Sequence, residues 1–289
     1  MLELLTQGRT NAMSGEVVVL NTFDVGTNTT QSVQSDVSLS ETQAVDWVVP
    51  SYVGYISAVA IGAGGSGDGS NNTNAGSGGG AGALAYITNY IVTKGDILRI
   101  YVGCKGRNVN TGGSGKRGNG ASGIRHNGKA ILLAGSGGGG ISQTTTGSGG
   151  IALIGDVRFN GGAGAAGGGN NGGDGGSVSN YYSTGLDGAA TSRLGGAGST
   201  PYGRLGNGTY MGTPRDPTAG ANGGIGANYG GGGGGANDET TGGTSYSGGD
   251  GGQGIVRIIY GRNRSFPDSF TSEQYSLGNL QVYDVNSLS

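Results

Sequence analysis

The chain has 289 residues, and 71 of them are glycine, against a usual glycine share of about 7%. The formal net charge is only −2 and charged residues make up 12%, which argues against a polyelectrolyte surface and a nucleic-acid partner. No apolar run approaches the roughly 18 residues of a membrane span, so we expect no membrane insertion. The single cysteine excludes an intrachain disulfide framework.

Apolar, strand-like runs alternate with glycine-rich inserts along the chain. The turn at 93–96 predicts one hairpin between two of these runs. The Asn127-Gly128 dipeptide, the strongest short hairpin signal, predicts another. The predicted strands cover residues 54–62, 83–92, 97–102, 124–126, 129–134, 151–159 and 255–260.

The largest glycine insert covers residues 161–254, and glycine recurs there at every third position, as at Gly248, Gly251 and Gly254. A polyproline-II helix has three residues per turn and no internal hydrogen bonds, so its backbone must find partners in neighbouring segments. A flexible linker is the alternative interpretation of such a composition. Here, however, each insert begins and ends at a predicted strand, which holds its two ends together.

We therefore predict an all-β fold: an antiparallel β-sheet or sandwich whose glycine-rich excursions pack as polyproline-II helices. Almost no α-helix is expected, because no long run repeats every 3.6 residues and glycine is a poor helix former.

The pattern divides the chain into three parts. Residues 1–43 are predicted to form an extended N-terminal attachment arm, with one short β-branched strand at 17–20. Residues 44–261 are predicted to form the glycine-rich β/polyproline-II domain. Residues 262–289 are polar with isolated aromatic residues, which predicts a C-terminal docking tail.

Several motifs stand in a definite order: WVVP at 47–50, IGAGG at 61–65, KGD at 94–96 and LLAGSGG at 132–138. In this order they resemble the glycine-rich domain of many phage virion proteins and, in a related form, of the anaplastic lymphoma kinase ectodomain. The ending GIVRIIYG at 254–261 with RSFP at 264–267 resembles a C-terminal signature common in virion proteins of marine and cyanobacterial phages. The resemblance implies a β-sheet domain with glycine helices, placed most often in a tail fibre or receptor-binding tip.

Residues with catalytic or metal-binding chemistry are sparse. The one histidine, His126, lies at a predicted hairpin turn, which disfavours a nucleophilic pair with the one thiol, Cys104. Asp68, Asn71 and Asn74 could offer oxygen ligands to calcium in a loop, although solvated turn residues are the simpler interpretation. We predict no catalytic residue, no metal site and no cofactor.

Tyrosines stand isolated among glycine, serine and asparagine in the second half of the chain. Tyrosine provides a large, rigid contact area and its small polar neighbours provide adaptable hydrogen bonding, as in antibody binding loops. One interpretation is a recognition surface for a host cell-surface glycan or outer-membrane protein. The other is that the tyrosines plug the ends of glycine helices or pack on the sheet. The candidate receptor-binding residues are Tyr181, Tyr182, Tyr202, Tyr210, Tyr229 and Tyr246.

These features lead us to expect a bacteriophage virion structural protein, namely a tail-fibre or tail-tip adhesin that binds a host surface receptor and is not an enzyme. Other virion proteins would bind the arm or the tail, and a homotrimer is expected because fibre proteins are usually symmetric oligomers. The N-terminus lacks the pattern of a secretory signal, so we expect assembly in the host cytoplasm and a place in the virion. A non-adhesive virion component, such as a head decoration, collar or connector protein, is the alternative. An ice-binding protein, supported by the threonines at 144–146, is a remote one.

Overall fold

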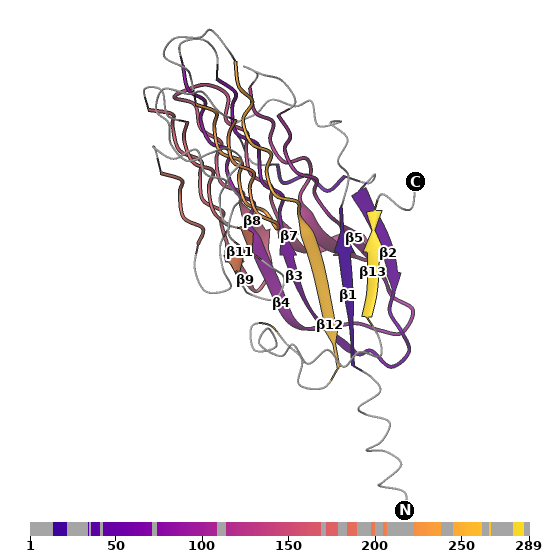
Figure 1. The fold of residues 1–289 in the computed structure, drawn as a ribbon. Helices are drawn as coiled ribbons and strands as arrows, with labels where there is room; N and C mark the ends of the chain where they lie inside the picture. Colours follow the sequence, from indigo (N-terminus) through magenta and orange to yellow (C-terminus); the bar gives the residue numbers. More distant parts are fainter. Residues whose placement is uncertain are drawn as a thin grey trace, which may run out of the picture.

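The computed structural model describes residues 14–21, 34, 36–40, 43–70, 74–108, 114–168, 172–178, 184–189, 198–199, 205–206, 222–237, 245–261, 266 and 280–285. These residues form two facing β-sheets and, continuing from one end of the sheets, a bundle of extended glycine-rich segments (Figure 1). The described part of the chain contains no α-helix and therefore no helix that could cross a membrane. The predicted all-β fold class is confirmed.

The first sheet has the strand order β13-β1-β12-β3-β4-β9. All of its neighbours are antiparallel except β1 and β13, which are parallel. Its strands are β1 (Gly15–Leu20), β3 (Tyr55–Ile61), β4 (Leu84–Ile91), β9 (Val157–Phe159), β12 (Ile255–Tyr260) and β13 (Leu280–Asp284).

The second sheet is antiparallel throughout, with the order β2-β5-β6-β7-β8. Its strands are β2 (Ala44–Val48), β5 (Ile97–Tyr101), β6 (Ser122–His126), β7 (Lys129–Ala134) and β8 (Ala152–Ile154). Two short strands, β10 (Gly198–Ser199) and β11 (Leu205–Gly206), pair with each other outside both sheets.

Of the two hairpin turns predicted from the sequence, one is present and one is not. Asn127 and Gly128 both have positive φ, at 50° and 76°, and join β6 to β7 as the predicted hairpin. The hairpin predicted across 93–96 is wrong, because β4 lies in the first sheet and β5 in the second. This turn crosses between the sheets: Gly95 N–H donates to Val49 O and Val49 N–H donates to Asp96 O, so it bonds to the end of β2 instead.

Alternating side chains of the two sheets build the sandwich core. Strand β12 shows the pattern: Val256, Ile258 and Tyr260 face the second sheet. Tyr260 stacks on Trp47 of β2 with ring centroids 5.8 Å apart. From the second sheet the core receives Val45, Trp47, Leu98, Ile100, Ile124 and Leu132, among others. A core of this kind explains how so glycine-rich a chain can still hold two sheets together.

The outer face of the first sheet is also buried and carries a charge pair. Ile255 and Ile259 of β12 lie in a second apolar cluster with Phe266. Between them, Arg257 donates to both carboxylate oxygens of Glu16 on β1, at 2.5 and 3.0 Å, and lies over the Phe266 ring. Arg257 is 1% exposed and Glu16 is 4% exposed, so water screens this pair very little.

Described parts of the predicted arm and tail take part in the first sheet. The strand predicted at 17–20 is present as β1, which lies between β12 and β13 and so has partners on both edges. Strand β13, from the predicted tail, also reaches the second sheet, because Trp47 Nε1–H donates to Gln281 Oε1 at 2.9 Å. Residues 14, 21, 34, 36–40, 43, 266 and 285 are also described, and the remaining residues of the arm and the tail lie outside the described part.

Each glycine insert extends from the end of one strand and returns to the start of another. The described segments between β3 and β4 are 62–70 and 75–83, those between β5 and β6 are 103–108 and 114–120, and those between β7 and β8 are 135–140 and 146–150. Between β9 and β12 they are 161–167, 172–178, 184–189, 222–227, 231–237 and 245–254. Together these segments form the glycine bundle, seen above the sheets in Figure 1.

Hydrogen bonds in the glycine bundle repeat every three residues. The N–H groups of residues 64, 67 and 70 donate to the carbonyls of 252, 249 and 246, at 2.8 to 2.9 Å. The N–H groups of residues 62, 65 and 68 donate to the carbonyls of 83, 80 and 77. A repeat of three is that of the polyproline-II helix, so the predicted packing of these excursions is confirmed for the described segments.

Two segments of the insert between β3 and β4 lie at the centre of the glycine bundle, although the insert at 161–254 is longer. Segment 62–70 donates to three neighbours, 75–83, 114–120 and 245–254, and accepts from three others, 103–108, 135–140 and 231–237. Segment 75–83 is likewise surrounded by 62–70, 135–140, 146–150, 161–167, 172–178 and 231–237. Such packing leaves no room for a side chain at the glycine positions that face a neighbouring backbone: a Cβ at Gly65 would lie 2.0 Å from Gly138 O.

We expect Gly65→Ala to destabilise the protein by on the order of 3 kcal/mol or more, because the methyl group would force two backbones apart. Gly54→Ala is the matched control, since a Cβ at Gly54 meets no atom within 4 Å. The control should be neutral or stabilising by up to about 1 kcal/mol, because alanine restricts the unfolded chain. Calorimetric unfolding measures both. Equal stabilities for the two variants would contradict the close packing.

Replacing Glu16 with glutamine should cost about 3–5 kcal/mol, because it leaves Arg257 charged and buried without its counter-ion. Asp46→Asn is the control: it breaks the Arg99–Asp46 pair at 3.0 Å, whose side chains are 39% and 48% exposed. Exposed pairs contribute at most about 1 kcal/mol. Urea midpoints compare the two variants, and a Glu16→Gln midpoint no lower than that of Asp46→Asn would refute the argument.

Candidate functional site

The glycine bundle ends, away from the sheets, in a tip formed by the turns between its segments. Segment 62–70 leads from β3 to this tip and segment 75–83 returns from it to β4. The turn at 141–145 lies at the same level, because Ser77 Oγ donates to Thr145 O and Gly167 N–H donates to Gln143 O. Ser114 Oγ also donates to Ile141 O. Side chains from several inserts thus fix this turn.

A pocket of about 230 Å³ opens at the tip. Its buried base contains Asp68 and Ala75, and its rim contains the exposed side chains of Asn74, Ser142 and Thr144. Ser114, Ile141 and Gln143 complete the wall. The pocket therefore combines one carboxyl group, two amides, three hydroxyls and two apolar side chains, all held by hydrogen-bonded segments.

Asp68 is the residue of this pocket with the most unusual environment. It is 6% exposed, and burial raises the pKa of its carboxyl to about 7, although a hydrogen bond from the Gly69 N–H acts in the opposite direction. No cationic side chain of the described residues pairs with it. Its backbone is fixed on both sides, because Asp68 N–H donates to Ser77 O and Asp68 O accepts from Ala236 N–H.

A second carboxyl group, that of Asp250, lies on the flank of the glycine bundle and differs in its partners. Lys105 Nζ lies 3.5 Å and Arg107 Nε 3.9 Å from its Oδ2, and the Asn108 N–H donates to its Oδ1. Burial raises the pKa of Asp250, while Lys105, Asn108 and Arg107 oppose the rise. Because cations surround it, this group ties the segment 103–108 to the segment 245–254.

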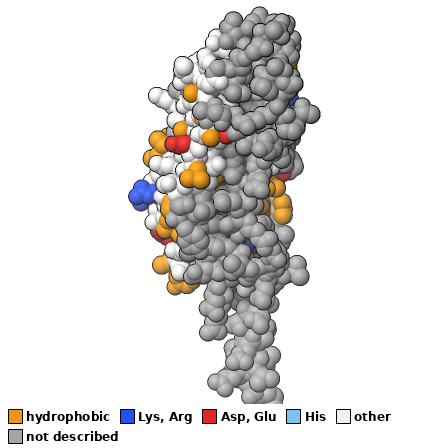
Figure 2. Space-filling model, turned by 60° about the vertical axis from the view of Figure 1, so that its left-hand side comes forward, with side chains coloured by type: hydrophobic (Ala, Val, Ile, Leu, Met, Phe, Trp, Pro, Cys, Tyr) orange, Lys and Arg blue, Asp and Glu red, His pale blue; other side chains and the backbone are white. Residues whose placement is uncertain are grey.

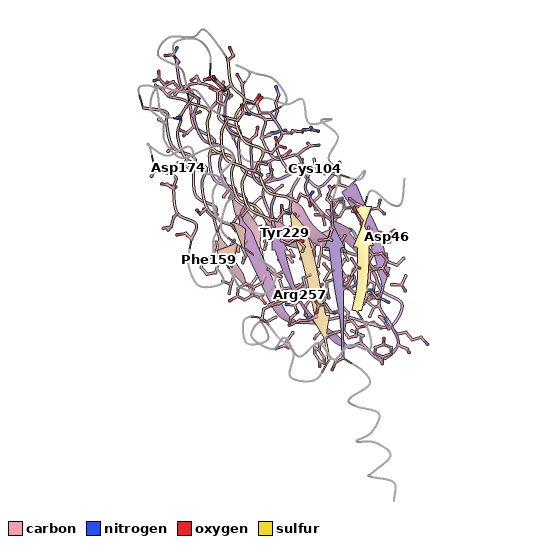
Figure 3. All side chains as sticks on the ribbon, in the orientation of Figure 1. Asp46, Cys104, Phe159, Asp174, Tyr229 and Arg257 are labelled. Atoms are coloured by element: carbon pink, nitrogen blue, oxygen red, sulfur yellow. The ribbon has the colours of Figure 1, made fainter. Side chains whose placement is uncertain are left out.

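The predicted tyrosines are only partly placed. Tyr181, Tyr182, Tyr202 and Tyr210 lie outside the described residues. Tyr229 lies where the bundle meets the sheets (Figure 3) and packs half-buried against the second apolar cluster; burial raises the pKa of its hydroxyl. Tyr246 is half-buried at the tip, where its backbone bonds to Ser70. The structure therefore does not bring these two together.

The other residues considered from the sequence have separate partners. Cys104 is buried and its Sγ accepts from Gln43 Nε2. His126 bonds to Tyr90 and to Asp96, near the end of the sandwich away from the bundle. The threonines at 144–146 belong to the tip turn and its end, where Ser142 and Thr145 bridge, so they do not form a flat repeating face.

Of the loop residues considered for calcium, Asp68 and Asn74 do meet in the tip pocket, whereas Asn71 lies outside the described part. The described residues contain no group of three or more His, Cys, Asp or Glu side chains that could hold a metal ion. Sequence reasoning did not single out Ser142 and Gln143. Their position in a short polar turn between two glycine segments was the only signal for them.

Figure 2 shows one side of the molecule, and charged side chains are sparse on its described surface. Most of that surface is uncharged side chain and backbone, with scattered apolar groups. Asp68 is the one charged residue among the described residues that line the tip pocket, so the site is suited to hydrogen bonding more than to attraction of a charged partner.

Comparison with known protein families identifies a related domain. The model of a family described as a glycine-rich domain matches residues 39–261. This range includes the two-sheet sandwich except β1 and β13, and all of the glycine bundle. A search of curated proteins finds no matching protein.

We expect Asp68→Asn to stabilise the protein at about pH 8, by on the order of a few kcal/mol, and to have little effect near pH 4. The folded-state pKa is raised to about 7, so the stability that Asp68 contributes at low pH is lost as the pH rises from about 4 through 7. Asparagine does not ionise, so the variant does not lose this stability as the pH rises. Melting temperatures at the two pH values measure the effect, with Asp46→Asn as the control. A variant that is less stable than the wild type at about pH 8 would contradict the assignment.

Proposed function

The chain belongs to the glycine-rich domain family, and we propose that it is a bacteriophage virion protein, a tail-fibre or tail-tip adhesin whose bundle tip binds a receptor on the host surface. In this proposal the protein acts by binding and not by catalysis. Other virion proteins hold it through residues 1–43 or 262–289, and it is present as a homotrimer.

The observation that carries the proposal is the opposite placement of the tip and of the start of β1. Gly15 pairs with Tyr260, at the end of the first sheet away from the bundle, whereas Leu20 pairs with Ile255 where the bundle begins. The chain therefore enters the sandwich at one end of the molecule and displays its turns at the other. An adhesin needs this arrangement, because one end must be held by the particle while the other meets the cell.

The rigidity of the glycine bundle supports the same proposal. A binding surface loses affinity when it must be ordered on contact, so a pre-organised support favours binding. Here the turn at 141–145 is fixed by hydrogen bonds from Ser77, Ser114 and Gly167. Its exposed hydroxyl and amide groups provide the adaptable hydrogen bonding typical of recognition loops. Tyr246 and the tyrosines at 181, 182, 202 and 210 remain candidate receptor contacts.

The experiment compares the same substitution at the two ends of the molecule. Purified protein should compete with the phage for adsorption to its host. Thr144→Arg, at the exposed tip, should weaken this competition by about tenfold or more, because a bulky charge would enter the contact. Thr93→Arg, at an exposed turn at the other end, should compete like the wild type.

Three outcomes separate the candidate functions. Wild-type protein that neither binds host cells nor competes would refute the adhesin. Immunogold labelling of the head or collar in intact particles would then favour the non-adhesive virion component. If Thr144→Arg competes like the wild type and Thr93→Arg does not, the receptor contact lies at the end of the molecule opposite the tip, and the proposed contact at the tip is refuted.

A further inference from the structure

We propose that the pocket at the tip binds one neutral sugar residue, whose hydroxyl groups donate hydrogen bonds to the Asp68 carboxylate. This inference rests on the proposed function and names the class of receptor for it: a glycan without charge on the bound residue. The pocket is the one defined above by Asp68, Asn74, Ala75, Ser114 and the turn at 141–144.

The size of the pocket favours a ring over an ion. A volume of about 230 Å³ is below the range of roughly 300–1,000 Å³ typical of drug-sized ligands and corresponds to a smaller molecule. A calcium site would instead surround its ion with six to eight oxygen atoms at about 2.3–2.6 Å. Among the described lining residues Asp68 is the only one with a carboxyl group, so these residues do not offer the several anionic ligands of such a site.

The chemistry of the wall matches a sugar. A pyranose ring carries several hydroxyl groups, each a donor and an acceptor, and an apolar face of C–H groups. Asn74 and Gln143 carry amides that can both donate and accept, and Ser142 and Thr144 carry hydroxyls at the rim. Ala75 and Ile141 provide apolar surface beside these groups. Because no Lys or Arg is among the described residues that line the pocket, the one charged group of this described lining that a phosphorylated or carboxylated residue would meet is the Asp68 carboxyl.

Asp68 gives the pocket its specificity. A buried carboxylate without a cation is costly unless donors satisfy it. The one hydrogen bond that it receives from the described residues comes from the adjacent Gly69 N–H, so the hydroxyl groups of a bound sugar can supply further donors. The group is also pre-positioned, because Asp68 belongs to the central segment 62–70, whose backbone bonds on both sides. A ligand therefore binds without having to order the side chain that recognises it.

The test uses saturation-transfer NMR at about pH 8, above the raised pKa of Asp68, on the full chain with free monosaccharides at millimolar concentration. The sugars are hexoses, 6-deoxyhexoses, pentoses and N-acetylhexosamines. At least one of these should give a signal with the wild type. Asp68→Asn should weaken that binding by about tenfold or more, the loss expected for a hydrogen bond to a charged group. Asp46→Asn, which changes a carboxyl of the second sheet, should bind like the wild type.

Several results would overturn the inference. One is the absence of signal from every sugar, and another is equal binding by Asp68→Asn. A third is a shift of the Asp68 resonances with calcium alone and not with any sugar, which would make the pocket a cation site. Since Asp68→Asn is expected to be at least as stable as the wild type, its loss of binding cannot be ascribed to unfolding, and calorimetry verifies this.

The adsorption assay separates this inference from the proposed function. If wild type and Asp68→Asn compete equally with the phage, the protein is an adhesin whose receptor does not use this pocket, and the sugar inference fails alone. If neither competes, the proposed function fails. If the wild type and Asp46→Asn compete with the phage and Asp68→Asn competes less, both the proposed function and the sugar inference are supported.

Discussion

Hydrogen bonds between the backbones of neighbouring glycine segments are the interaction on which the rest of this structure depends. A polyproline-II helix satisfies none of its own N–H and C=O groups, so it is stable in a protein only among other segments that supply partners. Segment 62–70 obtains those partners from six neighbours. At positions 62, 64, 65 and 67 glycine is needed for space and not for an unusual φ, because a Cβ there would displace an adjacent backbone.

The sandwich makes this bundle possible. Each excursion starts and ends at a strand, so the sheets fix its ends and reduce the entropy lost when it becomes ordered. The second apolar cluster shows the connection directly, since Val178 and Tyr229 of the bundle pack with Ile61 of β3 and Ile255 of β12. Side-chain packing therefore holds the sandwich together at one end of the molecule, and main-chain hydrogen bonds hold the bundle together at the other. The two regions are continuous, because the strands of the sandwich lead directly into the segments of the bundle.

Local features of the sequence predicted local structure well. The Asn127-Gly128 turn was predictable because positive φ at both positions restricts the chain to one kind of hairpin. The threefold glycine period was predictable because it is a property of a single helix. The turn at 93–96 was predicted wrongly, because a four-residue turn carries no information on whether the next strand pairs beside the last one or crosses to the facing sheet. That choice depends on its contacts with Val49, which lies far away in the sequence.

The candidate site was the least predictable part, because it belongs to no single stretch of chain. Asp68 and Asn74 were recognisable as polar loop residues, but the turn at 141–144 reaches them only through the packing of separate inserts. All of the contacts together determine which segments become neighbours. They also determine that the insert between β3 and β4 lies at the centre of the bundle.

The threefold repeat of the hydrogen bonds also limits how such a protein can change in length. Adding one or two residues to a segment would turn every later N–H and C=O towards the wrong neighbour. Adding three restores the direction and moves the end of that segment outward by about 9 Å. A longer bundle therefore requires insertions in multiples of three, made in adjoining segments together. The length of the bundle can then change only in steps of three residues per segment, whereas the sequence of its outermost turns is free to vary.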